Sequence, residues 1–428
     1  MVLSFSFSNV FSFREKQEIS FIPEGLKEFK YHLHNPNPFD SKEELLTSLA
    51  LYGHNSFGKS NVIKAVHFFK NFIRYSFKQP NLFNVEPFLL NIEALKEPSF
   101  FEIIIYIKET KYRYGFEIKS NKIISEWLYY STAGVRENYL FQRVEQDFVI
   151  SKSWNKENGN KIDLQSIPFS QPNILLLSVL SSQNISKVRE ISEKIDKMII
   201  LNDINNKVVE SAVKIFSNPK YQEEISNFIK GADLGFSTIF DKIEKKLKEN
   251  SDYNHEFLSI LYKDEIEKFE LYTKHAVYNK EFEKVDEIKF EMLKKESDGS
   301  IKFFIISSFL VYAIKNQLLI CIDELDSKLH NDLLEFLINR FHNPQINSLG
   351  AQLIFTTHNS IFLDKKLRRD QFLIAEKNKY GESSIKKLHT KETPIRIDSS
   401  IEKDYRKGNL GGTSKNVNKI NIQSRLFD

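Results

Sequence analysis

The chain has 428 residues and carries 61 Lys and Arg against 57 Asp and Glu, which gives a net charge of +4. A net charge this small gives no reason by itself to expect nucleic-acid binding. The 41% hydrophobic and 28% charged residues are typical of a folded globular protein. The single cysteine, Cys321, excludes a disulfide framework and a cysteine-rich zinc site, so we expect a reducing, cytoplasmic location. The length predicts one core with an inserted or appended lobe.

The first third of the chain predicts a strand, a loop and a helix in succession. Met1 to Ser12 alternates apolar and polar residues as a strand does and shows no export signal, and Ile19 to Ile22 is a second short apolar run. Leu46 to Tyr52 is short and apolar, which predicts a buried strand, and Asn61 to Phe72 has apolar residues at helical spacing. The loop that joins this strand to this helix spans residues 53 to 60.

This loop, Gly-His-Asn-Ser-Phe-Gly-Lys-Ser, matches every fixed position of the phosphate-binding pattern G-x-x-x-x-G-K-[ST]. Its glycines let the backbone curl and aim N–H groups at phosphate oxygens, its lysine reaches the terminal phosphates and its last serine holds Mg²⁺. We therefore predict that ATP and Mg²⁺ bind here, at Gly53, Asn55, Gly58, Lys59, Ser60 and Asn61.

The middle of the chain predicts a β-lobe followed by a helical segment. Phe100–Ile107, Tyr112–Ile118 and Ile123–Tyr130 are rich in β-branched and aromatic residues and predict an antiparallel meander to about Ile150. Ile174 to Leu180 is a continuous apolar run, which predicts a further strand.

Helical spacing then runs from Ile185 to Phe216 and predicts a helical segment, forming a hairpin with Tyr221 to Lys230. Alternation in Phe269–Val277 and Val285–Met292 predicts a strand pair. The predicted domains are residues 1–180 as the N-terminal half of a head with its β-lobe, 181–262 as a mainly helical inserted arm, and 263–428 as the C-terminal half.

The most apolar stretch, Phe303 to Ile322, is interrupted by Lys315, so it predicts a buried helix and a buried strand and no membrane span. Asp323 and Glu324 follow that strand. At a strand end, Asp323 can hold a metal through water and Glu324 can polarise an attacking water, because successive side chains point to different sides.

Two further segments carry polar residues where a phosphate could be met. Leu353 to Thr357 predicts another buried strand, and the residue it delivers, His358, can reach a terminal phosphate. Ser297 to Ser300 precedes an apolar helix, and small residues at a helix N-terminus present N–H groups to an anion.

In this order, the segments 53–61, 297–300, 320–326 and 356–359 resemble those of ABC-class ATPases of the structural-maintenance, recombination-protein F and overcoming-lysogenization-defect kind. Within that class the chain resembles the AAA-like abortive-infection ATPases. The narrower resemblance rests on the opening Phe5–Phe13 with Asn9 and Ser12, on Glu296–Gly299, on Asp326–His330, and on Tyr405–Gly412.

The resemblance implies an α/β fold: an ABC-type P-loop ATPase head with a mixed sheet, flanking helices and an antiparallel β-lobe, carrying a mainly helical insertion. It also implies that Ser297 and Gly299 contact the γ-phosphate held by a partner subunit, so that the chain self-associates through composite ATP sites. Asp326 would lie on the loop that crosses this seam, and Gln183 would sense Mg²⁺. The chain departs from the pattern by lacking the doubled glycine of transporters and by carrying Phe57 where many relatives have a small residue.

The function that the resemblance implies is an ATP-driven switch in anti-phage defence, with a phage-encoded trigger and a separate nuclease or toxin as effector. About 70 residues follow His358, too few for a nuclease domain of its own. An ATPase that acts directly on DNA is the alternative, and a scaffold that binds ATP with negligible turnover is a third reading. Basic clusters that bear on DNA binding are Lys242–Lys248, the group Lys365, Lys366, Arg368 and Arg369, and Tyr405–Leu426.

Overall fold

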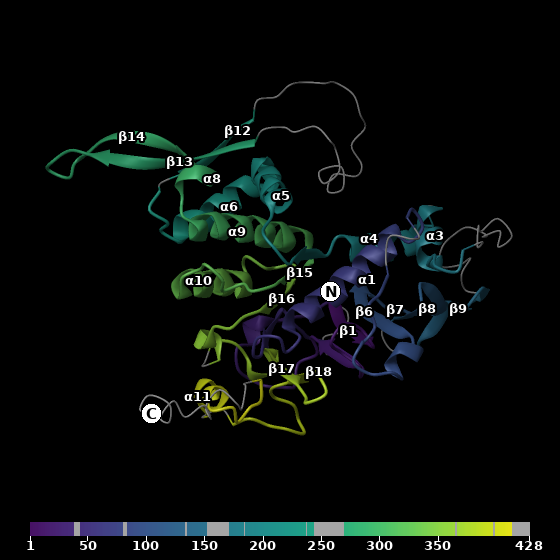
Figure 1. Ribbon diagram of the computed structural model, residues 1–428. Helices are drawn as coiled ribbons and strands as arrows, with labels where there is room; N and C mark the ends of the chain where they lie inside the picture. The colour runs from purple at the N-terminus through teal and green to yellow at the C-terminus, as the bar shows by residue number, and fades with distance from the viewer. Residues whose placement is uncertain are drawn as a thin grey trace, which may run out of the picture. The chain divides into compact units, whose positions relative to one another are not determined.

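The computed structural model describes residues 1–37, 43–79, 84–132, 135–151, 171–183, 185–236, 238–243, 269–363, 366–396 and 399–412 (Figure 1). The chain divides into two compact units. The first unit comprises Met1–Asn202, Gln317–Glu324 and Gly350–Asp428, and the second comprises Asp203–Asn316 and Leu325–Leu349. The segment 181–262, expected as one arm, is therefore divided between the two units.

A six-stranded sheet forms the centre of the first unit, in the order β11-β15-β16-β5-β17-β18. The first five strands are parallel and the edge strand β18 is antiparallel to β17, so the sheet is mixed. Its parallel strands consist mainly of buried apolar residues, as expected of strands that are covered on both faces. The bounds are β11 Ile199–Leu201, β15 Leu319–Ile322, β16 Gln352–Thr356, β5 Ser48–Tyr52, β17 Phe372–Lys377 and β18 Ser383–Lys387.

The second sheet of this unit is antiparallel and has seven strands, in the order β10-β9-β8-β7-β6-β1-β2. It confirms the predicted N-terminal strand and the predicted meander that ends at Ile150. The bounds are β1 Val2–Ser8, β2 Gln17–Ser20, β6 Ser99–Ile107, β7 Thr110–Lys119, β8 Lys122–Thr132, β9 Asn138–Val144 and β10 Asp147–Ile150, and a small ribbon pairs β3 Leu33–His34 with β4 Leu45–Leu46.

Helix α1 (Lys59–Tyr75) lies against the antiparallel sheet through aromatic side chains. The ring of Phe69 stacks on Phe116 of β7 at 5.7 Å between centroids and meets the edge of Phe5 of β1 at 5.3 Å. Residues of β5, among them Leu49 and Leu51, belong to the same buried apolar cluster. The helix that follows the phosphate loop is thus fixed by a core that both sheets share.

The predicted strand over Ile174–Leu180 is wrong, because the structure has helix α3 (Leu176–Ser182) there. The buried carboxylate of Glu126, on β8, accepts hydrogen bonds from the backbone N–H groups of Leu176 at 2.7 Å and Leu177 at 2.9 Å. These are N–H groups that a helix leaves without partners in its first turn, so an acid from a distant strand caps the helix. Helix α4 (Ser186–Asp196) follows.

The predicted helical run from Ile185 to Phe216 is interrupted by β11, because Ile199–Leu201 pairs in parallel with β15. The second unit contains α5 (Asn206–Ser217), α6 (Pro219–Gly231), α9 (Asp298–Asn316) and α10 (Asn331–His342). Aromatic pairs join these helices, such as Phe216 with Phe304 and Tyr221 with Tyr312. The part of the expected arm from 244 to 262 lies outside the described residues.

A three-stranded antiparallel sheet completes this unit, in the order β12-β13-β14. The predicted strand pair is confirmed as β13 (Phe269–Tyr278) and β14 (Lys284–Glu291), except that Met292 begins the short helix α8 (Met292–Lys295). The sequence did not predict β12 (Thr238–Ile243). None of the helices in the described residues is long and apolar enough to cross a membrane. The expected α/β fold class is confirmed.

The Glu126 cap predicts a large loss of stability in Glu126→Ala. This substitution removes the acceptor for two N–H groups and leaves Arg143, whose side chain is fully buried and lies 3.5 Å from the Glu126 carboxylate, without its counter-charge. We expect the free energy of unfolding to fall by about 3 to 5 kcal/mol, the usual cost of an uncompensated buried charge. Urea denaturation followed by circular dichroism measures it.

Glu117→Ala on β7 is the matched control, because its half-buried carboxylate accepts a hydrogen bond from the Ser125 hydroxyl and caps no helix. It should cost below about 1 kcal/mol. Equal losses in the two variants would contradict the capping role of Glu126.

Candidate functional site

The phosphate loop begins at the carboxyl end of β5 with a glycine that no other residue could replace without strain. Gly53 has φ +150°, and a Cβ atom there would lie 2.8 Å from the carbonyl oxygen of Ala375 in β17. Gly58 has φ +101°, and its Cβ would lie 2.7 Å from Ser383 Oγ and 2.9 Å from Ser12 Oγ. Both glycines of the pattern are therefore required by positive φ and by close neighbours.

The positive charge of the loop comes from Lys59, the first residue of α1. Its buried ammonium group donates hydrogen bonds to the carbonyl oxygens of Gly53 at 2.7 Å and His54 at 3.2 Å, so it lies inside the curl of the loop. The N-terminus of α1 adds the partial positive charge of a helix dipole at the same place. The arrangement suits a phosphate group.

The other predicted residues of the loop differ in their surroundings. Ser60 is half-buried in the first turn of α1, and Asn55 is exposed at the tip of the loop. The side-chain amide of Asn61 donates a hydrogen bond to Ser12 Oγ at 2.9 Å, which joins the helix to the segment after β1. Ser12 belongs to the opening segment on which the narrower family resemblance rests.

The carboxylates predicted to assist the loop stand at the end of β15, two strands away from β5. The strand between them is β16, which pairs in parallel with both β15 and β5. Its last residue, Thr356, donates a hydrogen bond from its hydroxyl to Asp323 Oδ1 at 2.5 Å and accepts one from the Glu324 backbone N–H at 2.7 Å. One hydroxyl therefore orients both acidic residues at the carboxyl edge of the sheet.

Thr356 lies outside the residues whose chemistry the sequence alone points to. Its position as a threonine at the end of a buried strand, two residues before His358, was the signal that could have found it. Parallel strand ends lie at one edge of a sheet, and a hydroxyl there reaches the polar residues that follow the neighbouring strand.

Glu324 has φ +48°, a left-handed conformation that is uncommon for a residue with a side chain. Such a conformation persists where neighbouring groups hold it, and the hydrogen bond from its N–H to Thr356 is one such contact. The side chain is exposed, while that of Asp323 is half-buried. The two acids thus have different environments.

His358 is exposed at the carboxyl edge of the same sheet. The residue after it is anchored twice, since the Tyr52 hydroxyl donates to the Asn359 carbonyl at 2.9 Å and the Asn359 N–H donates to Thr357 Oγ1 at 3.0 Å. Because Tyr52 immediately precedes Gly53, the segment that carries His358 is fastened to the start of the phosphate loop.

The donor set at this edge fits a magnesium ion bound together with a nucleotide. Ser60 and Asp323 offer oxygen ligands, and the described residues hold no group of three or more His, Cys, Asp or Glu side chains that would bind a metal by themselves. Mg²⁺ usually takes one or two protein oxygens and completes its shell with phosphates and water. The predicted metal ligand Gln183 lies exposed at the C-terminal end of α3 and remains a prediction.

The second unit brings together the remaining predicted residues. Ser297 Oγ accepts a hydrogen bond from the Ser300 N–H at 3.1 Å and caps the N-terminus of α9. A Cβ atom at Gly299 would lie 2.9 Å from the Lys328 carbonyl oxygen, and Lys302 Nζ donates to the Ser327 carbonyl at 2.7 Å. Ser297 and Gly299 therefore pack beside the loop that begins at Asp326.

A strand–loop–helix with this lysine and these glycines, in a parallel sheet of which another strand ends in two acids, defines a P-loop protein of the α/β class. Residues 48–364 match the family model described as "AAA domain, putative AbiEii toxin, Type IV TA system", and the chain belongs to this family. No curated protein gives a significant match.

Two solved structures of the recombination mediator protein RecF in the RecFOR pathway are similar to the chain. The RecF-ATPrS structure has 11% identity, covers 90% of this chain and 98% of its own, and gives a TM-score of 0.31. The RecF-ATP structure has 10% identity, covers 84% of this chain and 92% of its own, and gives a TM-score of 0.29. The family assignment rests on the sequence match.

The position of Thr356 predicts that Thr356→Val, which keeps the shape of the side chain and removes the hydroxyl, weakens the site. Asp323 loses its orienting donor and the Glu324 N–H loses its acceptor. We expect ATP turnover to fall by about 10- to 100-fold, the usual effect of removing the hydrogen-bond partner that orients a functional side chain.

A phosphate-release assay measures this turnover, with Thr47→Val as control. Thr47 is buried and immediately precedes β5, at the end of that strand away from the phosphate loop. Its hydroxyl donates a hydrogen bond to the His32 carbonyl oxygen. The control should keep its turnover within about twofold. Equal losses in both variants would show that Thr356 acts through general stability.

Proposed function

We propose that the chain is a Mg²⁺-dependent ATPase that works as a nucleotide-driven conformational switch in anti-phage defence. The observation that carries the catalytic part is the Thr356 hydroxyl, which holds Asp323 and Glu324 at the strand edge that also carries the Lys59 loop and His358. This common edge supports the proposal that the three segments act on one bound nucleotide.

In this proposal the residues divide the work of hydrolysis. Lys59 and the loop N–H groups bind the β- and γ-phosphates, and Ser60 and Asp323 hold Mg²⁺. Glu324 accepts a proton from the attacking water, and His358 contacts the γ-phosphate. The exposed position of Glu324 and His358 leaves both side chains accessible from the carboxyl edge of the sheet.

The assembly proposed is a pair of chains bridged by nucleotide, or a larger oligomer. Ser297, Gly299 and Asp326 would meet the triphosphate held by a second copy. Gly299 packs against Lys328, and Lys328 forms an ion pair with Asp298 at 2.8 Å. The segments that contain Gly299 and Asp326 are therefore neighbours, which supports a shared role at the nucleotide of a second copy.

The biological part of the proposal draws on the family, whose description names a toxin of a toxin–antitoxin system. We propose that this chain controls a separate effector, a nuclease or toxin, in response to a phage-encoded trigger in the cytoplasm.

Direct action on DNA is the weaker alternative, because two arginines of a predicted basic cluster do not offer their charges. Arg368 is fully buried and donates to Asp370 at 2.9 Å, and Arg369 pairs with Glu28 at 3.1 Å. A cluster whose charges are already paired adds little to phosphate binding. The clusters at 244–248 and 413–426 lie outside the described residues.

Glu324→Gln separates binding from hydrolysis. The amide cannot accept the proton of the attacking water, so ATP turnover should fall by roughly 10² to 10⁴ while ATP affinity stays within a fewfold. A phosphate-release assay and equilibrium titration with a fluorescent ATP analogue measure the two quantities. Unchanged turnover would remove Glu324 from this role.

Lys59→Ala is the comparison variant for this experiment. It should lose ATP affinity itself, because its ammonium group supplies the charge inside the loop. Retained affinity would refute the phosphate site.

Ser297→Arg tests the assembly. A bulky cation at the N-terminus of α9 should block ATP-driven association while each chain still binds ATP, and light scattering with and without ATP measures the change in mass. Asn339→Arg adds the same side chain at an exposed position of α10 and should leave association intact. Loss of ATP binding in Ser297→Arg alone would place Ser297 in the site of its own chain.

A further inference from the structure

The short helix α11 (Ile401–Arg406) brings one aromatic side chain to the start of the phosphate loop. The ring of Tyr405 meets the ring of Tyr52 edge-on, with centroids 5.8 Å apart. Burial raises the pKa of the Tyr405 hydroxyl above its usual value, and a hydrogen bond with the backbone of Gly53 acts in the opposite direction. The tyrosine therefore contacts the last residue of β5 and the first residue of the loop.

The same helix also contacts the segment that carries His358. Ser360, two residues later, donates a hydrogen bond from its hydroxyl to Glu402 Oε1 at 2.7 Å and accepts one from Arg406 at 3.0 Å. Arg406 and Glu402 form an ion pair at 2.6 Å, one helical turn apart. The side chains of Ser360, Glu402 and Arg406 thus form a small closed network at the start of the 3-10 turn Ser360–Phe362.

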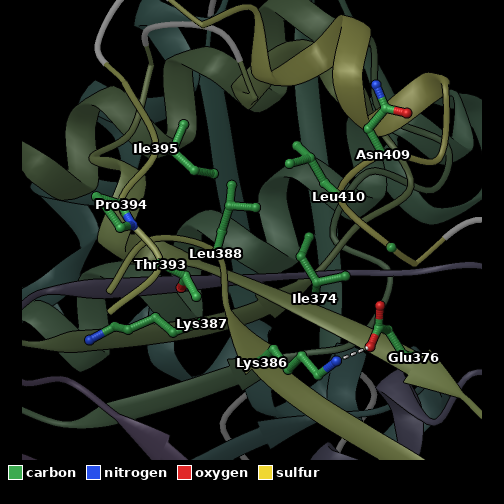
Figure 2. A pocket seen from close by; sticks show the side chains of 11 residues that line it. Ile374, Glu376, Lys386, Lys387, Leu388, Thr393, Pro394, Ile395, Asn409 and Leu410 are labelled. Atoms are coloured by element: carbon green, nitrogen blue, oxygen red, sulfur yellow. Dashed lines mark ion pairs between the residues drawn. The ribbon is translucent and has the colours of Figure 1, made fainter. Parts of the chain in front are cut away.

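The chain after α11 folds back on β17. A Cβ atom at Gly412, which has φ +70°, would lie 2.8 Å from Ile374 Cγ2 and 3.2 Å from the Tyr405 ring. On its other side the segment faces a cavity of about 450 Å³, into which Leu410, Leu388 and Ile395 point (Figure 2). The contacts of α11 with Tyr52, Gly53 and Ser360 lie on the side of the phosphate loop.

We propose that α11 is a positioning element for ATP turnover: Tyr405 sets the start of the phosphate loop, and Glu402 and Arg406 set the segment of His358 through Ser360. This rests on the proposed function, in which His358 contacts the γ-phosphate. Tyr52 already joins the two segments through its hydrogen bond to the Asn359 carbonyl, and α11 adds a second connection between them.

The energetics separate this role from general stabilisation. Arg406 is 68% exposed and Glu402 is 32% exposed, so their ion pair contributes little to the stability of the fold. Position matters more, because a misplacement of about 1 Å in a catalytic group costs about 100-fold in rate. A variant that breaks the network should therefore lose turnover without unfolding.

The test uses the full chain and three variants of α11. Glu402→Ala should lower kcat for ATP hydrolysis by about 10- to 100-fold, with the affinity for a fluorescent ATP analogue within about threefold. Glu402→Gln keeps an acceptor for the Ser360 hydroxyl and should recover most of the rate. Lys403→Ala, at the next and exposed residue, is the matched control and should keep kcat within about twofold.

A double variant shows whether Glu402 acts through His358. If it does, His358→Ala with Glu402→Ala should turn over no more slowly than His358→Ala alone, because residues that act as a unit are not additive. Fully additive losses would overturn the inference, and so would a Glu402→Ala variant that loses thermal stability and ATP affinity together.

The ATP binding and hydrolysis of the unsubstituted chain distinguish a failure of the positioning role of α11 from a failure of the proposed ATPase function. If it binds and hydrolyses ATP while Glu402→Ala matches Lys403→Ala, the positioning role fails and the ATPase stands. If it neither binds nor hydrolyses ATP, the proposed function fails and the positioning role falls with it.

Discussion

The site depends on one hydroxyl group that joins two strand ends. Thr356 closes β16, and through its side chain it fixes the carboxylate of Asp323 and the backbone of Glu324 at the end of β15. Because β16 also pairs with β5, the strand that enters the phosphate loop, these acids and the loop are held in one register. A slip of one residue in β16 would turn the hydroxyl to the other face of the sheet and release both acids.

Local chemistry made the phosphate loop predictable, whereas contacts between distant residues did not appear in the sequence pattern. Positive φ at Gly53 and Gly58, the lysine and the start of α1 all lie within eight residues and follow from the local motif. Thr356, in contrast, takes its role from a neighbouring strand end about 30 residues away in the chain. The sequence shows which residues could do chemistry, and the sheet decides which of them meet.

The wrong assignment of residues 174–180 has the same cause. A short apolar run fits a buried strand and a buried helix equally well, so its periodicity could not decide. What decided was the carboxylate of Glu126, which caps the first turn from a strand about 50 residues earlier, with Arg143 beside it. The strand β12 escaped prediction for a related reason: it exists through its pairing with β13.

The chain itself connects the predicted catalytic acids to the segments expected to meet a second copy. Glu324 ends a segment of the first unit, and the next residue begins a segment of the second, whose loop packs beside Gly299. From there the contacts continue to β13, since Thr273 donates to Glu296 at 2.5 Å just before Ser297. A change in the left-handed backbone at Glu324 therefore has a covalent route of two residues to Asp326.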